Sequence, residues 1–312
     1  MFDDVFDDVF DDDEPSGPNK RGFDDDDPQV LKRYRREAPE PSDVDTPESG
    51  DRWTTWDALQ TPRGPEPYPD WLVTELAAVD TELGVLKTGK EADVHLIERG
   101  MPGTDRACLL AAKRYRSTEH RLFHRDAGYV EGRRVRESRV TRAMATRTAF
   151  GRQALAGQWA SAEFDALVRL WAVGAELGCV AVPYPVQLLG TEVLLEFIGD
   201  PDGTAAPRLA QLRPPVDELV DLWRQLVDAL SVLARAGLAH GDLSPFNILV
   251  HNGRLVLIDL PQVVDIVSNP RGQEFLTRDV AVVASWFVKR GLPVDAGPLT
   301  AMLLSDAGAT WG

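Results

Sequence analysis

The chain has 312 residues, 43% of them hydrophobic, enough for one large domain or two modest ones with a real core. Its formal net charge is −16, and residues 1–66 carry 20 acidic against 8 basic residues, so the remainder is close to balanced and a nucleic-acid binder with a global positive field is disfavoured. Two cysteines, Cys108 and Cys179, give neither a disulfide framework nor metal-ligand spacing, and no signal peptide or apolar run of about 18 residues occurs. We therefore expect a soluble, cytoplasmic protein that does not span a membrane.

Residues 1–68 read as a disordered acidic tail followed by a linker. Phe2, Phe6 and Phe10 each precede a pair of aspartates, and so polar a segment buries too little apolar surface to offset about 1–2 kcal/mol of backbone entropy per residue. The four-residue spacing of the phenylalanines would give one apolar stripe if the segment became helical on a partner, for which a basic partner is expected. We place the start of the folded domain near residue 69.

Residues 85–96 predict two strands joined by a turn at Gly89. Backbone N–H groups in such a turn can lie over phosphates, although a single glycine is weak evidence. Residues 108–113 form an apolar strand that ends in Lys113. In this order, Lys113 stands where a kinase places the lysine that contacts the α- and β-phosphates, although an ordinary lysine at a strand end has the same local pattern.

Residues 116–152 contain ten arginines against four acidic residues. A solvated loop, a contact to RNA or to an acidic partner, and an intramolecular contact to the acidic tail all remain open for this insert. Apolar residues then return at helical spacing from Gln158 to Trp171. Glu163 is the acidic residue of this predicted helix best placed to pair with Lys113.

Residues 193–199 predict a strand that runs into Gly199 and could link two lobes while offering backbone groups to an adenine ring. Residues 216–236 have helical periodicity and end at Gly237. The helix leads directly into the polar segment that follows.

That segment, His240 to Asn247, reads His-Gly-Asp-x₄-Asn. An apolar run, Asn252-Gly253 and a second apolar run ending in Asp259 come after it, and Asn-Gly between β-rich runs is a strong hairpin signal. The hairpin would bring Asn247 close to Asp259, with Asp242 in the loop before it. Two oxygen ligands for Mg²⁺ and a further carboxylate suit phosphoryl transfer, and protein kinases have the same Asp-x₄-Asn spacing.

The chain after Asp259 is short. Only about 20 residues precede Asp279, and one final helix is expected over residues 279–290, ended by Gly291. These patterns predict an α+β, two-lobed, protein-kinase-like fold. Its small β-rich N-lobe would cover about residues 69–198, and a reduced, mostly helical C-lobe without the peptide-binding subdomains would cover about residues 199–312.

Over about residues 80–290, the chain resembles the RIO family of atypical serine/threonine kinases, closest to the subgroup with an S-T-G-K-E-A phosphate loop. Residues 88–94 resemble that loop, and residues 240–247 followed by 258–262 resemble the family's H-x-D-L-S-x-x-N and I-D-x-x-Q elements. Supporting matches fall at residues 129–130, 159–163, 196–199, 207–209 and 278–279.

The resemblance implies a role for each matching residue. The phosphate loop would comprise Thr88, Gly89, Lys90 and Glu91. Lys113 would contact the α- and β-phosphates and pair with Glu163, and the backbones of Glu196 and Ile198 would hold adenine. Asp242 would be the catalytic base or orient the acceptor, and Asn247 and Asp259 would bind Mg²⁺, with Mn²⁺ as an alternative.

The chain departs from the family's usual residues at several positions. Lys87 stands in place of serine and Asp93 in place of asparagine, while Gly241, Pro245 and Pro261 replace commoner residues. Lys87 and Asp93 could alter contacts in the phosphate loop. Neither of these two is at a metal or base position.

The resemblance implies ATP- and Mg²⁺-dependent phosphoryl transfer, either to protein serine or threonine or, in an ATPase cycle, to Asp259 as an aspartyl-phosphate. Small-molecule phosphotransferases of the aminoglycoside type share the H-G-D-L-x-x-x-N pattern and are one alternative. An ATP-dependent assembly factor with little kinase activity is another. A ribosomal or RNA partner rests on family analogy alone, and the protein substrate is unknown.

Overall fold

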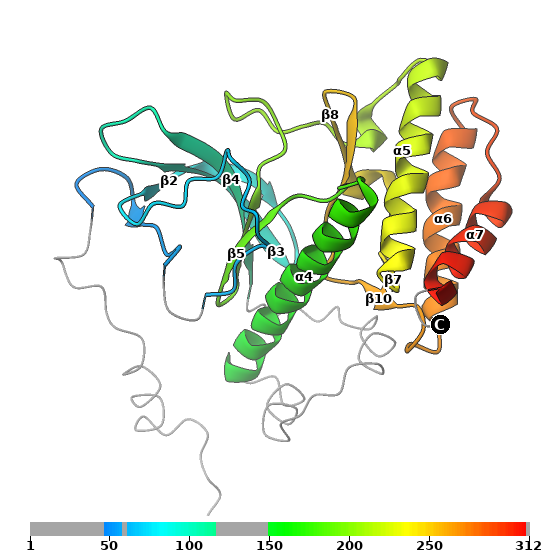
Figure 1. Ribbon diagram of the computed structural model, residues 1–312, viewed down its shortest axis with the longest axis horizontal. Helices are drawn as coiled ribbons and strands as arrows, with labels where there is room; N and C mark the ends of the chain where they lie inside the picture. The colour runs from blue at the N-terminus through cyan, green and yellow to red at the C-terminus, as the bar shows by residue number, and fades with distance from the viewer. Residues whose placement is uncertain (1–46, 58–60, 117–148, 310–312) are drawn as a thin grey trace, which may run out of the picture. The chain divides into compact units, whose positions relative to one another are not determined.

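The computed structural model describes residues 47–57, 61–116 and 149–309, all within one compact unit that begins at Thr46 (Figure 1). The acidic repeats and almost all of the arginine-rich insert lie outside the described residues. Among the described helices, none is long and apolar enough to cross a lipid bilayer. The two-lobed α+β fold expected from the sequence is confirmed.

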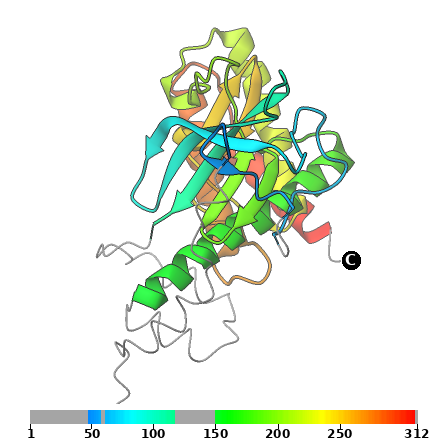
Figure 2. The same cartoon turned by 90° about the vertical axis from the view of Figure 1, so that its left-hand side faces the viewer.

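A six-stranded antiparallel sheet forms the N-lobe (Figures 1 and 2). Its strands, in spatial order, are β1 (Arg52–Trp53), β2 (Val79–Thr88), β3 (Ala92–Gly100), β4 (Ala107–Tyr115), β6 (Glu192–Glu196) and β5 (Pro185–Leu189). Leu110, Ala112 and Leu194 are almost completely buried in the core beneath it. Strand β4, predicted to end in Lys113, carries that lysine toward the other lobe.

The sheet's two edges are both covered by the segment that the sequence assigns to linker. At one edge β1 pairs with β2, and at the other the Gly64 N–H donates to Val186 O over 3.1 Å. Trp56 of the same segment is only 4% exposed and belongs to the N-lobe core. The ordered domain therefore includes residues before 69, because these residues satisfy backbone groups that sheet edges would otherwise leave unpaired.

Helix α4 (Ala149–Leu177) is longer than the 158–171 predicted, and it contacts strands β4 and β5 and the C-lobe helix α5 (Figure 1). Its buried residues Ala160, Phe164, Leu167 and Leu170 recur at three- and four-residue intervals and form one face. Glu163 lies on that buried face, and this placement decides the electrostatics of the site below.

The C-lobe in the described residues is built on three helices: α5 (Val216–Arg235), α6 (Gly272–Val288) and α7 (Ala296–Ala309). The periodicity predicted for residues 216–236 matches α5, in which Leu219, Leu222, Leu226, Leu230 and Leu233 are all buried, and Gly237 follows with a φ of 69°. Helix α6 begins seven residues before the predicted Asp279. Helix α7 was not predicted, and it packs against α5 and α6 through Leu299 and Leu303.

The predicted hairpin is confirmed: β8 (Ile248–His251) pairs with β9 (Arg254–Leu257) in antiparallel register. Asn252 and Gly253 have φ values of 51° and 74°, as a type I′ turn requires. The Ile258 N–H donates to Asn247 O over 3.0 Å, so the hairpin brings the two ends together as expected. The short 3₁₀ helices η1 (Leu209–Gln211) and η2 (Pro245–Asn247) and the paired strands β7 (Leu238–Ala239) and β10 (Val264–Asp265) complete the lobe.

Candidate active site

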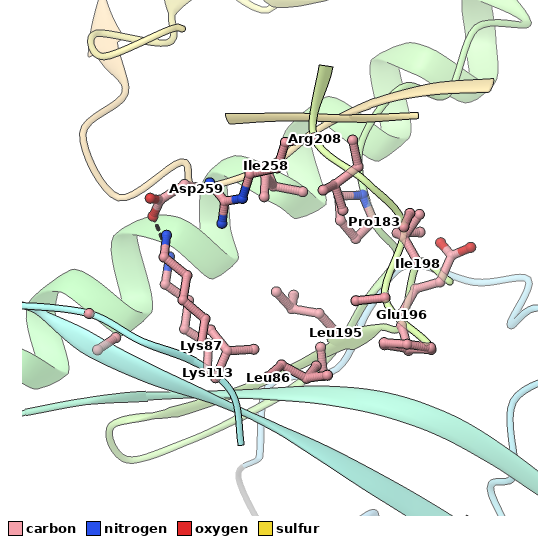
Figure 3. A pocket seen from close by; sticks show the side chains of 18 of the residues that line it. Leu86, Lys87, Lys113, Pro183, Leu195, Glu196, Ile198, Arg208, Ile258 and Asp259 are labelled. Carbon is pink, nitrogen blue, oxygen red and sulfur yellow. Dashed lines mark hydrogen bonds and ion pairs between the residues drawn. The ribbon is translucent and has the colours of Figure 1, made fainter. Parts of the chain in front are cut away.

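A cleft of about 750 Å³ lies between the N-lobe sheet and the β8–β9 hairpin (Figure 3). Eight of the residues predicted for the site line it: Gly89, Lys90, Glu91, Lys113, Glu163, Glu196, Ile198 and Asp259. Thr88, Asp242 and Asn247 are not part of its wall. The wall is apolar where Leu86, Leu195 and Ile258 face the cavity and charged around Asp259.

Lys113 connects the two lobes at the charged end. Its Nζ lies 2.7 Å from Oε1 of Glu163 and 2.7 Å from Oδ1 of Asp259. The expected pair with Glu163 is confirmed. Burial alone would lower the pKa of Lys113, but the carboxylates of Glu163 and Asp259 outweigh it and hold the pKa above its usual range. The lysine is therefore a fixed cation at neutral pH.

Glu163 is fixed from three directions. Besides the bond from Lys113, its carboxylate accepts a hydrogen bond from the Tyr115 hydroxyl over 2.5 Å and another from the Leu260 N–H over 3.0 Å. Burial, and then the charge of Glu163, raise the pKa of Tyr115 well above its usual value, so the hydroxyl stays a donor. A buried carboxylate with three donors is held rigidly and orients Lys113.

Asp259 has a left-handed backbone, with φ at 70°, a conformation that aspartate tolerates better than most residues. The turn places its carboxylate beside Lys113, and 36% of the side chain remains exposed toward the cleft. Burial alone would raise the pKa of Asp259, but the Lys113 ammonium lowers it to about 2. The carboxylate is therefore ionised at neutral pH.

The His240–Asn247 segment is held by α6. Asp279 accepts the Gly241 N–H over 2.7 Å and the Leu243 N–H over 3.0 Å, and burial raises its pKa. Arg278 donates to the Gly241 carbonyl over 3.0 Å and to Oδ1 of Asp242 over 3.1 Å. Two adjacent residues of α6 therefore fix the backbone around Asp242 and the direction of its carboxylate.

Asn247 has an amide that can serve a cation. Its Nδ2 donates to the Asp242 carbonyl over 2.9 Å, which directs its Oδ1 away from that bond. One amide oxygen and the ionised Asp259 carboxylate are hard oxygen ligands of the kind that Mg²⁺ and Mn²⁺ take, with phosphate oxygens and water completing the shell. No group of three or more His, Cys, Asp or Glu side chains with metal-ligand geometry occurs in the described parts of the chain, so this two-residue set fits a cation that arrives with a phosphate ligand.

The glycine turn between β2 and β3 is tight. The Gly89 N–H donates to Ala92 O over 3.0 Å, and a Cβ at Gly89 would lie 2.7 Å from that oxygen, so a larger residue would force the turn open. Asp93, which stands where the RIO-type phosphate loop usually has asparagine, forms a two-bond ion pair with Arg116, at 2.5 and 2.6 Å. The Asp93 carboxylate is thus already paired with the residue that follows β4.

The segment after β6 closes the apolar end of the cleft. The Glu196 N–H donates to Tyr184 O, and Oε2 of Glu196 accepts the Tyr184 N–H, both over 2.9 Å. The Ile198 carbonyl accepts the Ala206 N–H over 3.0 Å. The Glu196 carbonyl and the Ile198 N–H, which the resemblance assigns to adenine, both belong to this segment.

The sequence interpretation did not assign three of the residues found here. Tyr115 holds Glu163, and Lys87 and Arg208 line the cleft near Asp259. Arg208 had a signal, because it falls in one of the supporting matches at residues 207–209. Tyr115 had none, since its role depends on a helix that lies far along the chain.

Comparison with known proteins agrees with this geometry. The RIO domain family model matches residues 108–297. The RIO-type serine/threonine-protein kinase Rio1 of Haloferax volcanii is 32% identical over 231 residues, which cover 74% of this chain and 71% of that protein. Serine/threonine-protein kinase RIO1 of Caenorhabditis elegans is 33% identical over 215 residues, covering 68% of this chain and 38% of that protein. Serine/threonine-protein kinase RIO3 of Bos taurus is 34% identical over 142 residues, 45% of this chain and 26% of that protein.

Proposed function

This chain belongs to the RIO family of serine/threonine-protein kinases, and from that premise we propose that it binds ATP with a divalent cation and transfers the terminal phosphoryl group. The observation that carries the proposal is the Lys113–Asp259 pair at one end of a cleft whose other end is apolar. Phosphoryl transfer needs little covalent chemistry from a protein and depends on positioning and charge stabilisation. The cleft offers both.

The nucleotide would bind with adenine between the apolar walls, near the Glu196 carbonyl and the Ile198 N–H. The glycine turn of residues 88–91 would cover the phosphates, and Lys113 would contact them. Because Glu163 has three donors and cannot move freely, Lys113 would be held ready for the phosphates when they displace it from Asp259.

The cation would be held by Asn247 and Asp259, and when bound it would neutralise charge on the phosphates. Asp242 would orient the attacking hydroxyl and accept its proton. Arg278 donates to one oxygen of this carboxylate, which leaves the other for the acceptor. The acceptor would be a serine or threonine hydroxyl of a protein.

Transfer of the phosphoryl group to Asp259 itself is an alternative within this proposal. A carboxylate oxygen of Asp259 would attack the terminal phosphorus while the bond to the bridging oxygen breaks, giving ADP and an aspartyl-phosphate that water then hydrolyses. Support comes from the ionised state of Asp259 and from its partial exposure to the cleft. Such a cycle would act as an ATPase switch.

The test is incubation with ATP labelled at the terminal phosphate, followed by mapping of the label. Label on serine or threonine of an added protein supports the kinase, and a hydroxylamine-sensitive label on Asp259 supports the ATPase cycle. Label on an added aminoglycoside or metabolite would favour a small-molecule phosphotransferase. Failure of the protein to bind ATP or to release ADP under any of these conditions would overturn the proposal, and nucleotide binding without turnover would favour an assembly factor.

A further inference from the structure

Strand β2 contains an irregularity just before the glycine turn. In its pairing with β3, Val85 lies opposite His95 and Lys87 lies opposite Val94, so two residues advance on β2 for one on β3. Such a bulge changes which face of the sheet the next side chain takes. As a consequence Leu86 and Lys87, neighbours that would alternate in a regular strand, both line the cleft.

Lys87 enters the charged end of the cleft alongside Lys113. Figure 3 shows both side chains running from the sheet toward Asp259, and only Lys113 is joined to that carboxylate by a hydrogen bond. The carboxylate of Glu163 is already occupied by its three donors. Asp259 is thus the carboxylate toward which both lysines are directed.

Other positive groups surround Lys87. Burial lowers its pKa, the carboxylates of Asp259 and Glu91 oppose that effect, and the cations of Arg208 and Lys113 lower the pKa further. A cation that is partly desolvated and repelled by two neighbouring cations is stabilised when an anion enters between them. An anion that enters between Lys87, Lys113 and Arg208 would therefore reduce the repulsion among these three cations.

We propose that Lys87 is an additional nucleotide-binding residue whose ammonium group contacts the terminal phosphate, so that the site prefers nucleoside triphosphates to diphosphates. The assignment to the terminal phosphate follows from the proposed role of Asp259, because that residue would either hold the cation bound to the terminal phosphate or accept the phosphoryl group itself. Lys87 faces the same carboxylate from the side of the glycine turn. This inference rests on the proposed function and adds a specificity for the nucleotide state.

The experiment compares two ligands at fixed Mg²⁺: a non-hydrolysable ATP analogue with an imido bridge, and ADP. Dissociation constants are measured by calorimetry for the full chain and for Lys87→Ser, Lys87→Arg and Lys289→Ser. Serine is the usual residue at this position in the S-T-G-K-E-A phosphate loop of the RIO family. Lys289 is exposed at the end of α6 and serves as the matched control for loss of one lysine.

Lys87→Ser should weaken binding of the triphosphate analogue about 10-fold or more, because it removes a hydrogen bond between the Lys87 ammonium and a charged phosphate. Binding of ADP should change by less than about 2-fold, Lys87→Arg should retain part of the preference, and Lys289→Ser should bind both ligands as the unmodified chain does. Equal weakening of both ligands, or no change in either, would overturn the assignment of Lys87. Absence of nucleotide binding in the unmodified chain would instead overturn the proposed function.

Discussion

The ammonium nitrogen of Lys113 lies 2.7 Å from a carboxylate oxygen of Asp259, a residue 146 positions further along the chain and in the other lobe. This charge pair joins the two lobes at the charged end of the cleft. The same lysine has a second bond to Glu163 on α4, which would hold it in place if Asp259 bound another partner. The pair is therefore both a structural link and the place where a phosphate would enter.

Replacing Asp259 by asparagine should abolish turnover of ATP while the fold persists. The substitution removes the negative charge that would hold the cation or accept the phosphoryl group, but it preserves the size of the side chain. Lys113 keeps Glu163 as a partner. We expect ADP release to fall at least about 100-fold and the circular dichroism spectrum to be unchanged. Turnover near the unmodified level would remove Asp259 from the site.

Glu163→Gln should reduce both stability and nucleotide affinity. The buried Lys113 would lose one of its two carboxylate partners, and Tyr115 and Leu260 would donate to a neutral acceptor. Because Asp259 remains, the free energy of unfolding should fall by about 1–3 kcal/mol, less than for a pair broken completely. Urea denaturation measures this change. The control is Glu176→Gln, an exposed residue of the same helix, which should change stability by less than about 0.5 kcal/mol.

Arg278→Ala should slow turnover with little loss of stability. Half of the Arg278 side chain is exposed, so its ion pair with Asp242 contributes little to folding, but the pair fixes the direction of that carboxylate. We expect turnover to fall about 10-fold while the KM for ATP stays within about 2-fold, because Asp242 would act on the acceptor. Arg271→Ala removes an ion pair with Glu274 on the same helix and should leave both constants unchanged. A rise in KM alone would contradict this role.

The sequence predicted the features of the site that rest on local chemistry. Asn252-Gly253 specifies its turn without help from the rest of the chain, because both residues must take positive φ. Lys113 and Glu163 were paired from their order among motifs, and the helix period places Glu163 on the buried face of α4. The turn needed no knowledge of tertiary contacts, whereas the Lys113–Glu163 pair joins residues 50 positions apart and was predicted from the order of motifs.

The features that could not be predicted depend on irregular backbone. A period of two places Lys87 on the face opposite Leu86, and only the bulge in β2 brings both into the cleft. The first turn of helix α7 contains a glycine and a proline, Gly297 and Pro298, which obscure its apolar spacing. The segment around Gly64 that pairs with the edge of β5 has no regular secondary structure, so its sequence has no hydrophobic periodicity that would predict this contact.

Glu196→Gln should stabilise the protein at neutral pH and not at pH 4. Burial raises the pKa of Glu196 above its value in the unfolded chain, so the folded state binds the proton more tightly and stability is lost as pH rises above the unfolded pKa. Glutamine is neutral at every pH and can still accept the Tyr184 N–H. The midpoint of thermal unfolding should therefore rise at pH 7 and change little at pH 4. An equal effect at pH 4 and pH 7 would contradict a charge-based cause.

Two truncations should separate the linker expected from the sequence into parts with different roles. Removing residues 1–46 leaves every described contact of the domain in place, so the midpoint of thermal unfolding should change by less than about 2 °C. Removing residues 1–66 also deletes β1, the buried Trp56 and the Gly64 N–H that pairs with Val186. Loss of a buried tryptophan costs about 3–5 kcal/mol, so the midpoint should fall by about 10 °C.

The substitution Trp56→Ala in the full-length chain tests whether this loss comes from the core. It should reproduce about half or more of the fall caused by removing residues 1–66, because Trp56 fills the N-lobe core beside Tyr68 and the exposed sheet edges account for the rest. If both truncations unfold at the same temperature, the segment 47–66 adds nothing to stability and the domain begins where the sequence alone had placed it.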